Sequence, residues 1–111
     1  MAAIEVYREA IEKVFSDWRD FLSQEGNVQM EMVMDRERDR YLLVEVGWED
    51  DHRIYSPLLH VDLIGDELWI QHDGTERGIA GELVAAGVPK GRIVLAFRPE
   101  VERGWTDFAL A

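Results

Sequence analysis

The chain has 111 residues, 47% of them hydrophobic, with 23 acidic and 12 basic side chains, no cysteine and a formal net charge of −11. This composition predicts one globular domain over residues 1–111, and the missing thiols exclude disulfides, thiolate metal sites and cysteine nucleophiles. A surface so acidic repels phosphate, so it disfavours direct binding to DNA and is better suited to a basic protein partner.

The first predicted element is an amphipathic helix over residues 3–23. Its apolar side chains recur at steps of three and four residues, which is the spacing of one helix face. They are Ile4, Tyr7, Ile11, Val14, Phe15, Trp18, Phe21 and Leu22. Gly26 suits the left-handed backbone of a helix exit. Charged residues appear before any apolar run of signal-peptide length, and no segment reaches the roughly 18 apolar residues of a membrane span, so we expect a cytoplasmic protein.

Four strands joined as hairpins are predicted next. They cover residues 28–34, 41–49, 53–64 and 67–72. The methionines Met30, Met32 and Met34 follow the strand period, and they either pack in the core or form an adaptable partner surface. The charged residues 35–40 indicate a solvated turn, and Gly65-Asp66 has the form of a two-residue hairpin turn.

A second helix is predicted over residues 76–86. Asp73 or Thr75 can cap its start, and Asp73 with Glu76 has the spacing of a capping box. Gly87 is suited to end this helix in a left-handed conformation.

The remaining strand signals lie at residues 92–97 and, more briefly, at 106–110. The order of helix, four hairpin strands, helix and strand predicts an α+β fold. The strands over 41–49 and 53–64 are apolar on both faces, whereas two helices can cover one face. The second face requires either a second copy of the chain or a sheet that curls and closes on itself, and we expect a homodimer.

Histidines and acids cluster in the central part of the chain. His60 and Asp62 share one strand face, His72 follows one hairpin later, and Asp73 and Glu76 lie just beyond it. Two imidazoles and up to three carboxylates suit zinc or another divalent metal, and a histidine oriented by an aspartate suits acid–base chemistry. In the structural alternative, the histidines bond to backbone groups and Asp73 caps the helix. The pattern lacks tight ligand spacing such as His-Glu-x-x-His, which favours the structural alternative.

Aromatic and basic side chains offer a second set of candidates. Trp48, Trp69 and Trp105 have the rings to stack nucleotide bases, but such platforms come with a basic groove, so packing in a core or an interface fits this acidic chain better. Arg98 and Arg103 are candidates for ion pairs with the aspartates of the central cluster.

Several segments together resemble the XisI-like family, whose members control excision of a DNA element in nitrogen-fixing cyanobacteria. They are Val46-Gly47-Trp48, His60-Val61-Asp62, the run from Trp69 to Glu76, and Arg103-Gly104-Trp105-Thr106. The resemblance implies an accessory role beside a separate recombinase, and a companion protein of the XisH type. The residues assigned to the partner site or another site are His60, Asp62, Trp69, His72, Asp73, Thr75, Glu76 and Arg103.

We therefore expect a non-enzymatic controlling factor that needs no cofactor, binds no membrane and does not bind nucleic acid by itself. The alternative class is a metal-assisted hydrolase that uses His60, His72 and Asp73. Stoichiometric metal in the purified protein would favour that enzyme.

Overall fold

The computed structural model describes residues 3–23, 26–104, 106 and 108–109. Its helices are α1 (Ala3–Leu22), α2 (Ala80–Ala85), the 3-10 turn η1 (Lys90–Arg92) and α3 (Glu100–Arg103). Its strands are β1 (Val28–Asp35), β2 (Arg40–Glu49), β3 (His52–Ile64), β4 (Glu67–Asp73) and β5 (Ile93–Leu95). The expected α+β class and the order of the elements are confirmed, and the bounds of α1 to β4 agree with the predicted ones within about a residue.

The strands form one open sheet in the order β1-β2-β3-β4-β5. The first four strands pair antiparallel, and β5 lies parallel to β4 because the chain crosses over through α2. Since β1 and β5 lie at opposite edges, the sheet does not close on itself. Of the two covers weighed for its second face, the curled sheet is therefore wrong.

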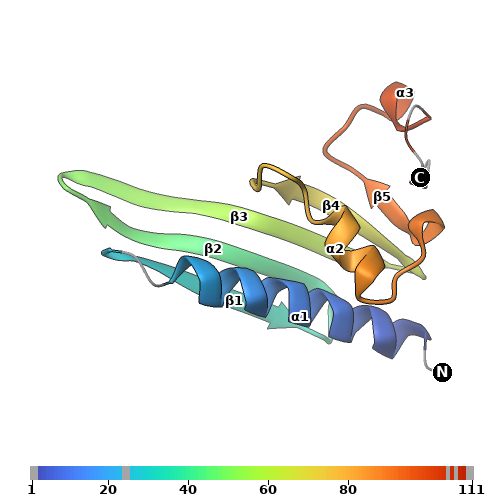
Figure 1. Ribbon diagram of the computed structural model, residues 1–111, viewed down its shortest axis with the longest axis horizontal. Coiled ribbons are helices and arrows are strands. Elements are labelled where there is room, and N and C mark those ends of the chain that lie inside the picture. The colour runs from blue at the N-terminus through green and yellow to red at the C-terminus, as the bar shows by residue number, and fades with distance from the viewer. Residues whose placement is uncertain (1–2, 24–25, 105, 107, 110–111) are drawn as a thin grey trace.

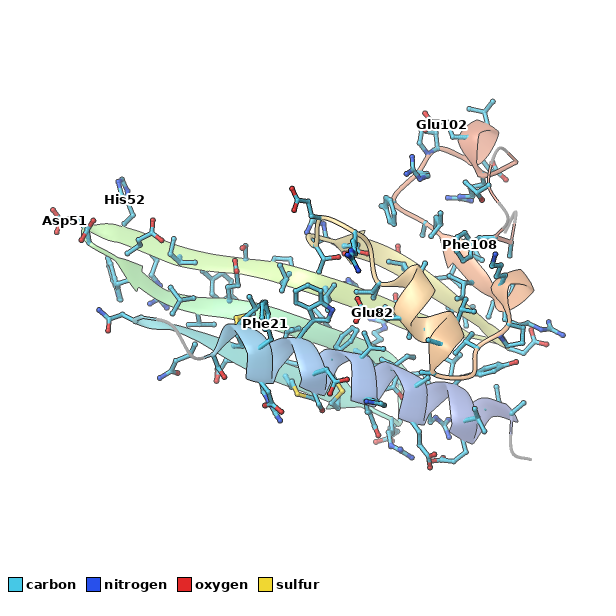
Figure 2. All side chains as sticks on the ribbon, viewed as in Figure 1. Phe21, Asp51, His52, Glu82, Glu102 and Phe108 are labelled. Atoms are coloured by element: carbon cyan, nitrogen blue, oxygen red, sulfur yellow. The ribbon has the colours of Figure 1, made fainter. Side chains whose placement is uncertain are left out.

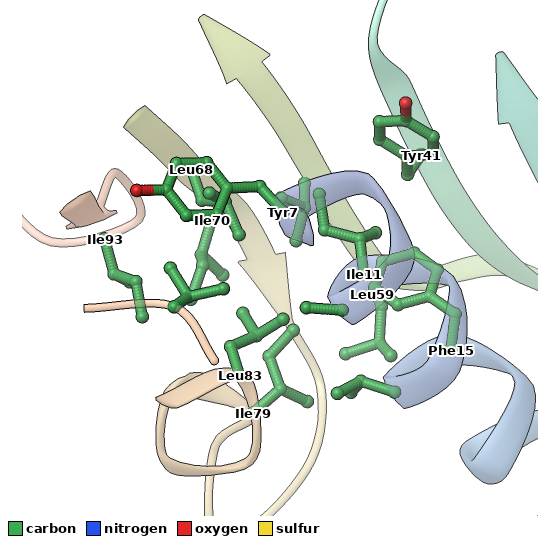
Figure 3. Packing of buried hydrophobic residues seen from close by; sticks show 14 of the residues in the cluster. Tyr7, Ile11, Phe15, Tyr41, Leu59, Leu68, Ile70, Ile79, Leu83 and Ile93 are labelled. Atoms are coloured by element: carbon green, nitrogen blue, oxygen red, sulfur yellow. The ribbon is translucent and has the colours of Figure 1, made fainter. Parts of the chain in front are cut away.

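One face of the sheet carries the hydrophobic core. Helices α1 and α2 both lie over this face (Figure 1), and apolar side chains from both helices and from the strands interlock beneath them (Figure 3). The buried residues of α1 recur at helical spacing, as predicted, and they are Tyr7, Ala10, Ile11, Val14 and Phe15. Within the described part of the chain, no helix is long and apolar enough to cross a membrane.

The apolar stripe of α1 leaves the core before the helix ends. Phe21 is 69% exposed, whereas Leu22 is half-buried. Adjacent residues such as Val14 and Phe15 are both buried further back in the helix, whereas here only Leu22 turns toward the protein. The prediction that Phe21 belongs to the buried stripe is wrong.

Helix α2 begins four residues later than predicted. Gly78 has a φ of 84°, which interrupts helical backbone, and the side chains of Asp73 and Thr75 bind the N–H groups of the loop before Ala80. The predicted capping box between Asp73 and Glu76 does not form, because Glu76 lies in this loop and not in the first turn of a helix.

The C-terminal elements are shorter than the sequence indicates. Strand β5 keeps three residues of the predicted 92–97, since Arg92 belongs to η1 and a turn begins after Leu95. Helix α3, which was not predicted, follows Pro99 and has acidic residues in its first turn. The brief strand at 106–110 reduces to a single parallel bridge between Val94 and Ala109, and its Leu110 lies outside the described residues.

The charged β1–β2 turn is docked onto α1 and is not merely solvated. Arg36 donates to Glu12 through two nitrogens, at 2.7 and 2.9 Å, and to Glu5 at 2.7 Å. Arg8 donates in turn to both carboxylate oxygens of Asp39, at 2.9 and 3.1 Å. These bonds lower the pKa of Asp39, mainly through Arg8, and the pKa of Glu12, mainly through Arg36.

Candidate functional site

His60 and Asp62 form a hydrogen-bonded pair on the face of the sheet that α1 and α2 leave free. Their neighbours Leu59 and Val61 are fully buried on the helix side, so the alternate residues point the other way. The Nε2 atom of His60 lies 2.9 Å from Oδ1 of Asp62, and the two side chains are 30% and 16% exposed. Gln71 donates to the other oxygen of Asp62 at 3.3 Å. The imidazole is therefore oriented by an aspartate, as the spacing predicts.

His72 and Asp73 lie on opposite faces of β4. His72 pairs in register with His60, and Asp73 pairs with Leu59, whose side chain is in the core. Because side chains alternate along a strand, Asp73 points to the helix side while the His60–Asp62 pair lies on the other. The predicted grouping of His60, His72 and Asp73 is therefore split by the sheet. No group of three or more metal-ligating side chains comes together among the residues that the structure describes.

Asp73 and Thr75 build the loop that joins β4 to α2. One oxygen of Asp73 accepts from the backbone N–H and the hydroxyl of Thr75, at 2.9 and 2.6 Å. Its second oxygen accepts from the N–H of Ile79 at 2.7 Å, and the Thr75 hydroxyl accepts from Gly78 at 3.1 Å. The carboxylate thus binds the start of the helix, as a cap does, but from six residues away.

Gly74 fits this loop against the neighbouring strand. A Cβ at position 74 would lie 3.0 Å from a side-chain carbon of Leu58 and 3.2 Å from its carbonyl oxygen, to which Gly74 donates. Beside this loop lies a hollow of about 210 Å³, bordered by the exposed Glu76. Its lining residues are Asp73, Thr75, Glu76, Arg77, Gly78, Phe97 and Arg98. The contacts within this loop therefore give Asp73, Gly74 and Thr75 a structural role.

Trp69 and Arg103 hold the C-terminal segment over the free face at β4 and β5. The guanidinium carbon of Arg103 lies 5.8 Å from the centre of the Trp69 ring. Arg103 also donates to backbone carbonyls, which are those of Leu95, Ala96 and Arg98. The Nε1 atom of Trp69 is buried and has no hydrogen-bond partner among the described atoms. Trp69 therefore packs between the sheet and the C-terminal segment.

The other aromatic and basic candidates lie apart from this cluster. Trp48 is 52% exposed at the far end of β2, with the guanidinium of Arg53 5.4 Å from its ring centre. Arg98 lies 3.8 Å from Glu102 in place of the expected aspartates. Trp105 falls outside the described residues.

A hollow between α1 and α2 was missed at the level of sequence. It measures about 280 Å³ and is lined by Asp17, Trp18, Phe21 and Glu82. The indole N–H of Trp18 lies 3.1 Å from both carboxylate oxygens of Glu82, and Trp18 meets Phe21 edge to face, with ring centres 5.9 Å apart. Figure 2 labels Phe21 on α1 and Glu82 on α2. The signal was the three-residue step between Trp18 and Phe21, which places two large rings on one side of a helix next to acids.

Comparison with known proteins identifies relatives along the whole chain. The sequence model of the family described as XisI protein matches residues 1–110. The fold is similar to that of a XisI-like protein from Anabaena variabilis, with a TM-score of 0.89, 31% identity, and coverage of 98% of this chain and 99% of that one. It is also similar to the fdxN element excision controlling factor XisI from the same organism, with a TM-score of 0.85, 30% identity and the same coverage. No curated protein sequence matches the chain.

Proposed function

Because the chain belongs to the XisI family, we propose that it is a non-enzymatic controlling factor for excision of a DNA element, and that it acts by binding a companion protein of the XisH type. The structural relative named as an excision controlling factor supports the first part. The charge and its distribution support the second.

The observation that carries the proposal is the pairing of the basic side chains. At least seven of the 12 cations already contact carboxylates within 4 Å, so at most five are left to contact phosphate. They are Arg8, Lys13, Arg19, Arg36, Arg38, Arg92 and Arg98. The unpaired excess is negative, and DNA affinity depends on cationic contacts. A basic region of a protein is the complementary partner.

The hollow between α1 and α2 is the surface that fits a basic side chain. Trp18 and Phe21 supply aromatic rings, which attract a cation through their faces, and Asp17 and Glu82 supply carboxylates. Asp17 is exposed and accepts from Lys13 through one oxygen, at 2.9 Å, so its other oxygen is left to accept from a cation of the partner. We infer that a lysine or arginine of the companion enters this hollow.

The alternative hydrolase loses its geometric basis. A shared site requires His60, His72 and Asp73 to converge on one reacting group. The sheet separates His60 from Asp73, and both oxygens of Asp73 already accept hydrogen bonds from its own loop. We therefore do not propose that activity.

The test is binding to the XisH-like protein encoded in the same genome, measured by titration calorimetry with both purified proteins. We expect a complex, and we expect Asp17→Lys to weaken it at least about tenfold, as loss of a charge pair in an interface does. The control is Asp51→Lys, which makes the same charge change at the far end of the β2–β3 hairpin (Figure 2). Absence of a complex, or equal weakening by both variants, would contradict the proposal.

Function in the cell is tested by the recombined junction. Deletion of the gene should reduce the amount of excised element, quantified by amplification across the junction. Complementation with Asp51→Lys should restore excision and complementation with Asp17→Lys should not. Restoration of excision by both variants would show that the α1–α2 hollow is not needed for function.

A further inference from the structure

A large part of the sheet has one bare face. We call this part the open face, and its residues are Val33, Leu42, Val44, Val46, Trp48, Tyr55 and Pro57. They align across β1, β2 and β3 on the side opposite α1 and α2. On the same side the guanidinium of Arg103 lies over Trp69, and Ala109 pairs with Val94 beside β5, so the C-terminal segment lies at β4 and β5 (Figure 1). Among the described residues, none other than those of β1–β3 packs on the open face.

The open face is apolar and accessible. Val33 is 47% exposed, Trp48 52% and Tyr55 70%. Single exposed apolar residues are ordinary on a protein surface, but a contiguous patch marks a surface that binds another molecule. Three neighbouring strands contribute here, so the residues form such a patch.

The accessible surface of the chain is larger than expected for a monomer of its mass, as in a protein described without its partner. Its accessible surface is 6884 Å² for 12.8 kDa, whereas a monomer of this mass is expected to expose about 6,300 Å². The radius of gyration is 14.4 Å, against about 13 Å for a compact domain of this length. The excess of roughly 600 Å² approaches the ~800 Å² that each partner buries in a standard interface. Figure 1 shows one source of it, the β2–β3 hairpin that reaches past the end of α1.

Charge identifies the occupant. Glu31 lies on the open face itself, in register with Val44, and the charged residues that border this face are Asp35, Arg40, Arg53 and Asp62, so the surface carries three negative and two positive charges. The patch is therefore close to neutral on a chain whose net charge is −11. A basic companion gains little there, whereas two acidic copies repel each other least across this surface.

We propose that the open face packs against the same face of a second copy of this chain, which makes a two-fold dimer. Such an interface is a sheet-on-sheet layer in which both inner faces are apolar. It places Val44 near the centre, because β2 is the middle strand of the patch. His60 pairs in register with Leu42, so the His60–Asp62 pair lies at the rim of this interface.

The experiment is sedimentation equilibrium of the purified protein alone, which keeps it independent of the companion. We expect a dimer at micromolar concentration. Val44→Arg should raise the dimer dissociation constant at least about a hundredfold, since it puts a long charged side chain at the centre of the interface, where the facing sheet packs. The matched control is Val101→Arg, because Val101 is 71% exposed on α3 and lies outside the open face. Tyr55→Arg, at a 70% exposed position, gives a second disrupting variant that contributes little to the monomer fold.

Three outcomes would overturn the proposal. A wild-type monomer at micromolar concentration would do so, as would a dimer that persists in Val44→Arg and Tyr55→Arg. A monomer whose binding to the companion is lost in these two variants and kept in Val101→Arg would assign the open face to the companion. Circular dichroism of each variant ensures that only folded chains are compared.

Discussion

At the scale of single residues, the aspartate of the signature has a structural role that is visible in its contacts. Asp73 accepts three hydrogen bonds from residues of its own loop, including the N–H of Ile79 just before α2. An N-cap interaction is typically stabilising by about 1 kcal/mol. Here one carboxylate oxygen accepts from Thr75, and the other accepts from the N–H of Ile79 at the start of α2.

The stability of variants at position 73 should depend on how many of these two accepting oxygens are kept. We expect Asp73→Ala to cost about 2 kcal/mol in the free energy of unfolding, because it leaves donors of the loop without their acceptor. Asp73→Asn should cost about half as much, since an amide has one accepting oxygen and cannot serve both sites. Urea denaturation measures both values, with the exposed Glu76→Ala as a neutral control. Equal stability of all three variants would show that the loop does not depend on the carboxylate.

A glycine of the signature is required by a close approach of backbone. A Cβ at Gly47 would lie 2.2 Å from the carbonyl oxygen of Asn27 and 2.7 Å from the Cα of Val28. We expect Gly47→Ala to destabilise the protein by about 1–3 kcal/mol, since β1 must move away from β2. The control is Gly81→Ala in α2, where nothing lies within 4 Å and alanine favours the helix. Thermal unfolding should show a lower Tm for the first variant and an unchanged or higher Tm for the second.

At the scale of elements, ionic contacts join the β1–β2 turn to α1. Arg36 and Arg8 bind carboxylates across this junction, and the hydroxyl of Tyr41 donates to Asp39 at 2.8 Å. Asp39 is itself part of the tight turn, with a φ of 54°. The β1–β2 turn therefore fixes the position of α1 on the sheet. This position brings Trp18 of α1 against Glu82 of α2.

The same contacts predict how stability depends on pH. The pKa of Asp39 is lowered in the folded state, chiefly by Arg8, so its contribution is complete above the unfolded value of about 3.9 and is lost as the pH falls through the folded pKa. Asp39→Asn keeps a side chain that tolerates positive φ but removes the charge. We expect a lower Tm for this variant at pH 7 and a difference from wild type that vanishes in acid. The control Asp20→Asn, in an exposed pair with Arg19, should leave the profile unchanged. A difference for Asp39→Asn that persists in acid would contradict this account.

At the scale of the whole molecule, the two sides of the sheet have different chemistry. The helix side carries the acidic hollow between α1 and α2, and the other side carries the nearly neutral open face. In the two proposals made above, the basic companion and the second copy would bind opposite sides of the sheet and so would not compete. At least seven of the 12 cations are paired with acids, which lowers the positive charge left to contact a phosphate backbone.

Binding of duplex DNA by the protein alone should therefore be weak. We expect a dissociation constant no tighter than the ~10⁻⁴ to 10⁻⁶ M of ordinary non-specific binders at physiological salt. Fluorescence anisotropy of a labelled duplex containing the element boundary measures it, with an unrelated duplex as the control. A complex at nanomolar protein would show that the fold concentrates positive charge despite the acidic composition.

The sequence by itself determined the α+β class and the place of most elements. Hydrophobic periodicity gives the face of α1 and the bounds of β1 to β4, because helices and strands repeat at different steps. The resemblance to the XisI family also rests only on the order and spacing of residues such as Val46-Gly47-Trp48. It is confirmed by the family model, which matches residues 1–110. The pairing of His60 with Asp62 also follows from spacing, since residues two apart share a strand face.

Only the tertiary structure decided which of these residues act together. Register places Asp73 on the side opposite to His60, and no local pattern reports a register between distant strands. Side-chain bonds in the loop delay α2 to Ala80, against the helical spacing of its apolar residues. The hollow beside Trp18 and the bare open face arise where elements meet or fail to meet. They depend on packing across the sheet, and periodicity along the chain carries no information about that packing.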